Sequence, residues 1–431
     1  MIQLVEKDEQ TTRAFVEQLM ARAGEKDRKV DAIVADILEN VRQNGDAAVK
    51  AYTEKFDGKA PEKLEISREE IKELMKQCEP NFLEALERAA ENIRDFHKRQ
   101  KQQSWLDTKA NGVILGQRVR GLARAGIYVP GGTAAYPSSV LMNAIPAKIA
   151  EVGEIIMVTP PGKNGMPNPD IMAAAYVAGV DRVFLVGGAQ AVAALAYGTE
   201  TIPKVDKIVG PGNIFVATAK KHLYGTVDID MIAGPSEILI VADETADPEF
   251  LAADLMSQAE HDVMASAILL TTSKEIAEQT IQAIYRQVET LERREIIEKS
   301  LDDFGAVIVC ETMDEAVEFA NDLAPEHLEL CAKNPLEYIG RLDNCGSLFL
   351  GNYAPEPLGD YYAGPNHVLP TSGTARFFSP LSVDSFVKKS SFIYYTEDAL
   401  RDAHDDIVKL AETEGLTAHA NAIKVRFPEK N

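Results

Sequence analysis

Apolar residues recur at three- and four-residue intervals through two stretches near the start of the chain, residues 31–49 and 68–101. Acidic and basic residues occupy the positions between them. On a helix this spacing gathers the apolar side chains on one face and leaves the charged ones in solvent. The pattern predicts that residues 1–110 are helical and supply a surface layer or an oligomer arm.

From residue 121 onward, short apolar runs alternate with helical stretches. A first series of strands is expected at residues 124–130, 154–159, 181–186 and 207–209, with helices at 137–150, 171–178, 189–197 and 214–224. A second series is expected at 237–242, 265–271, 306–310, 327–330 and 347–350, with helices at 248–260, 274–290 and 313–322. Strands and helices in alternation form a parallel sheet covered on both faces. We therefore expect an α/β protein with two such units and a separate C-terminal segment from about residue 382.

The composition limits the partners and the compartment. The 431 residues include 45 Lys and Arg and 67 Asp and Glu, which gives a formal net charge of −22. Such a balance disfavours nonspecific binding to nucleic acid or to anionic membranes. The sequence has neither an uninterrupted apolar run of about 18 residues nor a basic N-terminal region before an apolar run, so we expect no membrane span and no secretory signal. The four cysteines are scattered without CxxC spacing, which favours a reduced, cytoplasmic protein.

Glycine marks three of the expected turns between strand and helix: Gly131-Gly132, Gly187-Gly188 and Gly210-Pro-Gly212. These turns are expected at the carboxyl ends of parallel strands, where open α/β folds bind their ligands. Glycine lets the backbone approach a pyrophosphate, and the helix that follows offers free N–H groups. Three residues near these turns are placed to contact a dinucleotide: Tyr128, Gln190 and Asn213. Glycine is also common in ordinary turns and no G-x-G-x-x-G is present, so purely structural turns remain the alternative.

The helix expected at residues 248–260 changes character in its last turn, where the inward leucine stripe continues into Gln258 and His261. Their i,i+3 spacing places both side chains on one face, a suitable geometry for two ligands of one ion. Asp360, in a loop bounded by glycine and proline, and His419 complete a nitrogen and oxygen ligand set that suits zinc. Taken singly, each of these residues is better explained as an ordinary surface side chain.

Glu326 and His327 lie where a helix ends and the strand at residues 327–330 begins. Adjacent Glu and His side chains held by a strand end offer two groups with different proton affinities, as acid–base chemistry requires. The alternative is that the two side chains point to opposite sides of an edge strand.

Taken together, these segments resemble histidinol dehydrogenases, and the resemblance covers essentially the whole chain. It is carried by several motifs in order: Gly126–Gly132, Val186-Gly-Gly-Ala-Gln190, Val209-Gly-Pro-Gly-Asn213, Ala233-Gly-Pro-Ser-Glu237, Ser257–His261, Ala324–Leu330, Gly359–His367 and Glu414–His419. The resemblance implies a homodimeric enzyme of histidine biosynthesis that oxidises L-histidinol through the aldehyde to L-histidine with two NAD⁺. It also implies one zinc ion per subunit and active sites shared between the two chains.

The resemblance assigns roles to particular residues. Zinc would be held by Gln258, His261, Asp360 and His419; histidinol would also contact Ser236, His327 and Glu414; NAD would contact Tyr128, Gln190 and Asn213. Glu414 and His419 are expected from the partner chain, and Glu326 and His327 are expected to accept protons.

The implied fold has two incomplete Rossmann-like domains of the aldehyde-dehydrogenase type. Residues 28–127 and 237–381 are expected to form the domain with the metal and catalytic residues, and residues 128–236 the NAD side. Residues 1–27 would be a helical arm, and residues 382–431 a dimerisation segment.

The expected chemistry removes two hydrides and adds one water, so the aldehyde has to be retained while the cofactor exchanges. Zinc that anchors the imidazole and amino groups of histidinol would explain this retention. We expect His327 to take the alcohol proton and Glu326 to activate the water that attacks the aldehyde. A covalent cysteine route is disfavoured, because Cys310 and Cys331 end apolar strands and Cys345 has no basic neighbour in sequence.

Three other functions remain open at this point: a dehydrogenase of another polar diol, a zinc hydrolase with Glu326 as base, and a noncatalytic nucleotide-binding protein. The pair Ser236 and Glu414, which suits an imidazole and an amine, argues against the first.

Overall fold

The computed structural model describes residues 2–5, 19, 28–131, 136–162 and 164–427. The chain divides into two compact units, residues 1–100 with 122–386 and residues 101–121 with 387–431. The larger unit contains two six-stranded sheets, and the smaller one contains a three-stranded sheet. The predicted class, an α/β protein with two parallel-sheet units, is confirmed.

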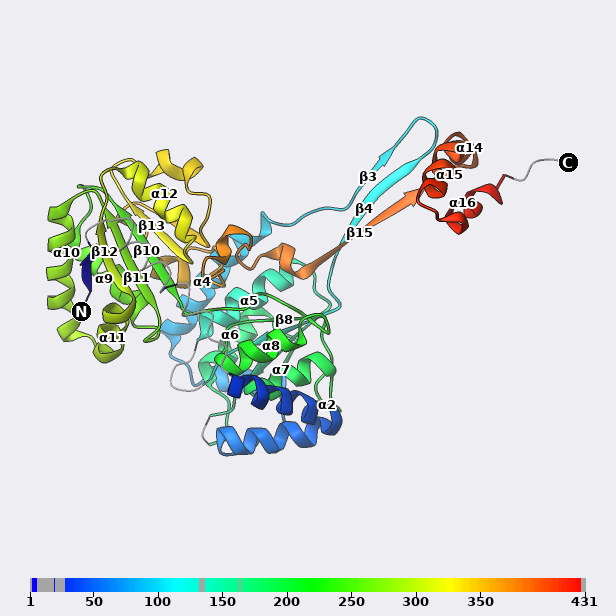
Figure 1. Cartoon of the computed structure of the whole chain (residues 1–431). Helices are drawn as coiled ribbons and strands as arrows, with labels where there is room; N and C mark the ends of the chain where they lie inside the picture. Colours follow the sequence, from blue (N-terminus) through cyan, green and yellow to red (C-terminus); the bar gives the residue numbers. More distant parts are fainter. Residues whose placement is uncertain (1, 6–18, 20–27, 132–135, 163, 428–431) are drawn as a thin grey trace. The chain divides into compact units, whose positions relative to one another are not determined.

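The strands of the second series form a fully parallel sheet in the order β1-β12-β11-β10-β13-β14. Their bounds are Gln3–Val5 (β1), Glu237–Ala242 (β10), Ser266–Thr271 (β11), Gly305–Val309 (β12), His327–Cys331 (β13) and Ser347–Leu350 (β14). Successive residues of a strand face opposite sides of its sheet. One face therefore packs against α9 (Pro248–Ala259), α10 (Lys274–Gln287) and α11 (Arg294–Phe304), and the other against α12 (Met313–Leu323) (Figure 1).

The strands of the first series form the other large sheet, in the order β2-β7-β6-β5-β8-β9. Their bounds are Glu65–Ile66 (β2), Arg124–Tyr128 (β5), Glu154–Thr159 (β6), Arg182–Leu185 (β7), Lys207–Val209 (β8) and Asp228–Ile229 (β9). All pairs are parallel except β2 with β7. The helices of this half are α2 (Arg28–Asp57), α3 (Arg68–Met75), α4 (Pro80–Lys98), α5 (Pro137–Ile149), α6 (Pro169–Ala178), α7 (Gly188–Tyr197) and α8 (Ile214–Leu223).

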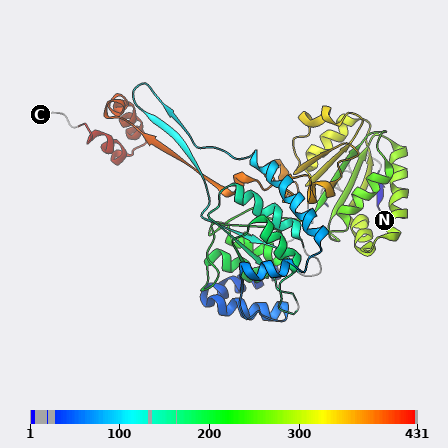
Figure 2. The same ribbon diagram turned by 180° about the vertical axis from the view of Figure 1, so that it is seen from behind.

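The N-terminal helices belong with this sheet, which differs from the expected grouping of residues 28–127 with 237–381. The apolar stripe of α2 (blue in Figures 1 and 2), which includes Val34, Val41 and Val49, shares one core with α7 and α8, and β2 pairs with β7. Periodicity predicted which face of α2 is buried, but it holds no information about which sheet covers that face. Of the expected arm at residues 1–27, only residues 2–5 and 19 are described, and Gln3–Val5 is a strand rather than part of a helix.

The smaller unit joins two distant parts of the sequence in an antiparallel sheet of order β15-β4-β3. Its strands are β3 (Trp105–Thr108), β4 (Ile114–Gly121) and β15 (Val387–Tyr394), followed by the helices α14 (Glu397–Asp402), α15 (His404–Thr413) and α16 (Thr417–Lys424). The expected helical region at residues 1–110 therefore ends too late, because residues 105–108 form a strand. All four of these residues are exposed, so the sequence carries no alternation of buried and exposed positions that would reveal the strand.

Within the part of the chain that the structure describes, no helix combines the length and the apolar character needed to cross a membrane.

Candidate active site

The end of α9 brings two of the predicted metal ligands together. Asp247 caps the N-terminus of this helix and Pro248 begins it. Gln258, in the last turn, is 1% exposed, and its Oε1 atom has no hydrogen-bond partner among the described residues. His261 lies just beyond the helix and donates its Nδ1–H to Ser257 O at 3.1 Å, which leaves Nε2 as the free nitrogen.

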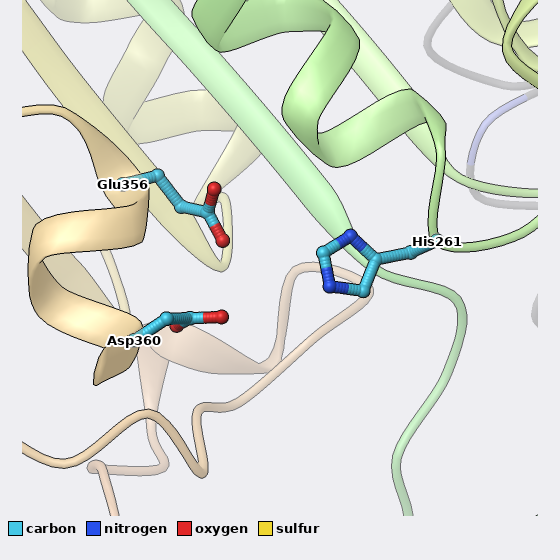
Figure 3. A group of neighbouring side chains, drawn as sticks. All are labelled: His261, Glu356 and Asp360. Atoms are coloured by element: carbon cyan, nitrogen blue, oxygen red, sulfur yellow. The ribbon is translucent and has the colours of Figure 1, made fainter. Parts of the chain in front are cut away.

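A short helix, α13 (Glu356–Tyr361), carries Asp360, which was expected in a loop. Two carboxylates, Glu356 and Asp360, are spaced i,i+4 on this helix and therefore lie on one face. One ligand atom from each of His261, Glu356 and Asp360 lies within 4.8 Å of the other two (Figure 3). The histidine ring reaches from the end of α9 toward both carboxylates of α13 (Figure 3). The metal-ligand prediction did not include Glu356, although its i,i+4 spacing from Asp360 is visible in the sequence.

The Glu326–His327 pair lies at the start of β13, which is flanked by β10 and β14 and is not an edge strand. Both side chains are buried, and His327 Nδ1 lies 3.6 Å from Glu326 Oε2. The backbone of Glu237 holds both groups: its N–H donates to Glu326 Oε2 at 2.9 Å, and its carbonyl accepts from His327 Nδ1 at 3.0 Å. The two side chains therefore meet instead of pointing to opposite sides of the sheet.

The free nitrogen of His327 faces the acidic cluster. Since Nδ1 donates to a carbonyl, the neutral ring carries its lone pair on Nε2, which is buried without a hydrogen-bond partner among the described residues. Nε2 lies 3.7 Å from Asp360 Oδ1, so the predicted catalytic histidine and a predicted metal ligand are neighbours. A second histidine that was not predicted to act here, His367, donates its Nδ1–H to Asp360 O at 3.1 Å.

Burial and mutual charge set the proton affinities of this cluster. Burial raises the pKa of Glu326 to about 7, against the attraction of His327. Burial lowers the pKa of His327, but the carboxylates of Glu326 and Asp360 outweigh it and hold the value at about 10. Burial, followed by the charge of Asp360, raises the pKa of Glu356 to about 8. Burial raises the pKa of Asp360, but hydrogen bonding and attraction to His327 and the charge of His367 outweigh burial and lower the pKa to about 2. At neutral pH these interactions favour protons on His327 and Glu356 and leave Asp360 ionised.

Ser236, the predicted substrate contact in this half, is partly buried and immediately precedes β10. Its carbonyl accepts from the N–H of Ser266 at 3.0 Å, which aligns β10 with β11. The next residue, Glu237, holds Glu326 and His327, so Ser236 lies beside the acid–base pair.

The predicted nucleotide residues lie at the carboxyl ends of β5, β7 and β8, strands of one parallel sheet. Tyr128 is buried, its hydroxyl accepts from the N–H of Gly188 at 3.0 Å, and burial raises its pKa to about 12. Gln190 is buried, and neither polar atom of its side chain has a partner among the described residues. Gly210 has φ +111, and a Cβ there would lie 2.1 Å from Tyr128 O, so this turn accepts only glycine.

Asn213 has a structural role in addition to its predicted role in NAD binding. It is the N-cap of α8, where its Oδ1 accepts from the N–H groups of Phe215 and Val216 at 3.1 and 3.2 Å. The side chain remains exposed at the helix N-terminus. Gly132, in the first of the glycine turns, lies outside the described residues.

The last two predicted site residues, Glu414 and His419, lie in the smaller unit. Glu414 is the C-cap of α15 and His419 is in α16, and both are exposed.

Comparison with known proteins gives one consistent result. A sequence model described as histidinol dehydrogenase matches residues 20–427. A histidinol dehydrogenase of Clostridium acetobutylicum is 58% identical over 427 residues and covers 99% of both chains. One from Bacillus cereus is 54% identical over 429 residues and covers 100% of both. The crystal structure of histidinol dehydrogenase from Elizabethkingia anophelis matches with a TM-score of 0.93 at 39% identity, over 99% of this chain and 98% of that one.

Proposed function

The chain belongs to the histidinol dehydrogenase family and is an NAD-dependent oxidoreductase of histidine biosynthesis, and from this premise we propose its full reaction and site. We propose that it oxidises L-histidinol through the aldehyde to L-histidine, with two NAD⁺ and with one zinc ion per subunit. The observation that carries the proposal is the meeting of His261 and Asp360 beside the buried Glu326–His327 pair.

The donor groups present fit a zinc ion. His261 offers Nε2 and Asp360 offers an ionised carboxylate. Gln258 offers its Oε1 atom, a buried acceptor to which no described residue donates. Nitrogen and oxygen donors of this kind suit zinc, and an open position is typical of a catalytic site. We assign zinc to these three residues together with His419 of the partner subunit. When bound, the ion anchors the substrate and supplies a positive charge next to the acid–base pair.

His327 is suited to accept the alcohol proton. Its ring is oriented by the Glu237 carbonyl, so that Nε2 is available as the proton acceptor. A cation at Asp360 would neutralise part of the negative charge that keeps a proton on this ring, and the neutral ring could then act as the base. The hydride goes to NAD⁺, which the protein binds at the glycine turns.

Glu326 is suited to the second oxidation, in which a water adds to the aldehyde. Its pKa of about 7 lets it accept the proton of this water near neutral pH. The gem-diol that forms loses the second hydride, which again needs a proton acceptor, and the pair of Glu326 and His327 provides two.

We assign NAD binding to Tyr128, Gln190 and Asn213. Gln190 supports this most directly, because both of its buried amide atoms lack a partner among the described residues, and such atoms are costly unless a ligand satisfies them. The N-terminus of α8 next to Asn213 offers N–H groups to a phosphate.

We further propose a homodimer with shared sites, located in the cytoplasm. The smaller unit presents exposed Glu414 and His419, whereas the other predicted ligands are all in the larger unit. Glu414 and Ser236 would contact histidinol. In the part of the chain that the structure describes, none of the four cysteines is in a disulfide, which suits a reducing compartment.

A spectrophotometric assay tests the function. Purified protein with histidinol and NAD⁺ should form two NADH and one histidine per histidinol consumed, and a chelator should abolish the reaction until zinc is restored. Turnover of a simple diol in preference to histidinol would indicate a related dehydrogenase. Hydrolysis without NADH would indicate a zinc hydrolase. NAD binding without turnover after zinc loading would indicate a binding protein.

A further inference from the structure

Behind the metal-ligand cluster lies a second pair of carboxyl groups, Asp254 and Glu329, to which no role in the reaction has been assigned. Glu329 is on β13 two residues after His327, so both side chains are on the same face of the sheet. It is 1% exposed, whereas most glutamates are on protein surfaces. Asp254 is on α9, one turn before Gln258, and is partly buried.

Glu329 makes two contacts that join separate elements. Its Oε1 accepts from the backbone N–H of Glu356, the first residue of α13, at 2.7 Å. Its carboxyl also neighbours the carboxyl of Asp254, and burial followed by the charge of Asp254 raises the pKa of Glu329 well above its usual value. Its Oε2 receives no N–H or hydroxyl donor among the described residues, so the Asp254 carboxyl is the group available to it. Two neighbouring carboxyl groups hydrogen-bond to each other only when they share a proton.

A third contact closes the network. Ser257, the residue before Gln258, has its Oγ 3.0 Å from Oε2 of Glu356. Glu329 therefore links β13 to both α9 and α13, and Ser257 links α9 to α13 directly. These are the three elements that carry Gln258, Asp360 and His327.

We propose that Asp254 and Glu329 are positioning residues of the metal site, a hydrogen-bonded carboxyl pair that fixes α13 against α9 through β13. The inference rests on the proposed function, because it takes the joined residues to be metal ligands. The six-residue α13 is too short to be stable alone, so its placement depends on such contacts. Groups that orient metal ligands in this way typically contribute about 10- to 100-fold to metal affinity.

The test compares Glu329→Gln with Glu329→Leu. Glutamine can accept from Glu356 N–H through its oxygen and donate to Asp254 through its amide, so it keeps both contacts. Leucine has a similar size and keeps neither. The matched control is Thr280→Val, a buried and nearly isosteric change in α10, a helix that carries none of the residues of this network.

Two measurements are made on each full-length protein: zinc affinity by chelator competition, and hydrogen exchange of residues 356–361 without metal. We expect Glu329→Leu to lose about 10- to 100-fold in zinc affinity and to exchange faster at these residues. Glu329→Gln and Thr280→Val should match the wild type in both.

Asp254→Asn provides a second variant if Glu329→Leu fails to fold. Its amide can still donate to Glu329, so it should behave like Glu329→Gln, and Asp254→Leu like Glu329→Leu. Equal exchange at residues 356–361 in the wild type and both leucine variants would overturn the inference, whether or not zinc binds. A wild type that binds no zinc would instead refute the proposed metal, and the exchange data would still decide the positioning role.

Discussion

Glu326 and His327 are adjacent in sequence, yet they are suited to different steps, and this division can be measured. Glu326→Gln keeps a side chain that fills the buried space but cannot accept a proton. We expect this variant to release one NADH per histidinol and to stop at the aldehyde, because the first step depends on His327. His327→Gln should form its first NADH about 10²- to 10⁴-fold more slowly than the wild type. Single-turnover counting of NADH checks both, with Glu318→Gln on the exposed side of α12 as control. Two NADH from Glu326→Gln would contradict the assignment.

The same carboxyl predicts a pH dependence of the second step. Glu326 acts as a base only when it is ionised, and burial raises its pKa to about 7. The rate of aldehyde oxidation should therefore fall as the pH decreases through about 7, whereas an ordinary glutamate would keep its activity to lower pH. The measurement is kcat for the aldehyde against pH. A profile that stays flat well below pH 7 would argue against Glu326 as the base.

The cysteines provide a negative test at the level of single side chains. Burial raises the pKa of Cys345 and of Cys78 to about 11, and it raises the pKa of Cys331 further. The thiolate that a covalent route needs is therefore scarce at neutral pH. We expect each of the four cysteine-to-alanine variants to retain turnover, measured as NADH formation. Loss of the chemical step alone in any one of them would instead support a covalent route.

Among the secondary-structure elements, the turn after β8 is stabilised by a buried ion pair. Lys220 and Asp230 form a buried ion pair, in which Lys220 also donates to Gly210 O at 3.0 Å and Asp230 accepts from Gly210 N–H at 2.8 Å. Lys220→Met would leave Asp230 buried without its partner, which typically costs about 3–5 kcal/mol. We expect lower stability in urea and a higher KM for NAD⁺, whereas Lys221→Met, at the exposed neighbouring position, should change neither. An unchanged KM would show that the turn does not depend on this pair for its shape.

The regular elements were largely predictable, because buried strands and amphipathic helices leave a periodic pattern in the sequence. Strands β10 to β14 were all expected close to their observed bounds. The exposed strand β3 and the short helix α13 were missed, since neither has enough buried positions to form a pattern. The family resemblance, which the comparisons confirm, came from the order of several motifs rather than from periodicity.

The site was less predictable than the fold. Gln258 and Asp360 are separated by many residues, and no local pattern specifies that α9 and α13 lie together. Glu356 was overlooked because two carboxylates one turn apart are common on surface helices. The contact between Glu329 and Asp254 depends on the pairing of β13 with β10, which places the strand below α9, and it could be found only in three dimensions.

For the assembled enzyme, the central prediction is that each site draws on both subunits. A chain with His261→Ala and a chain with His419→Ala should each be inactive alone. Refolded together at equal concentrations, half of the dimers should be mixed, and each mixed dimer should have one complete site. Activity should then recover to about a quarter of the wild type, as two-fold symmetry requires. If all ligands came from one chain, the mixture would remain inactive.

The pairing of β15 with β4 also determines when the enzyme is completed during synthesis. Val387 pairs with Gly121, so the whole of residues 122–386 emerges between the two partners. While the ribosome is still translating, β3 and β4 form only a two-stranded hairpin, which is marginally stable by itself. Domains fold as they emerge from the ribosome, but this three-stranded sheet cannot form until β15, near the end of the chain, has been synthesised. A chain that ends just before β15 would thus contain every strand of both large sheets and leave the first hairpin without its third strand.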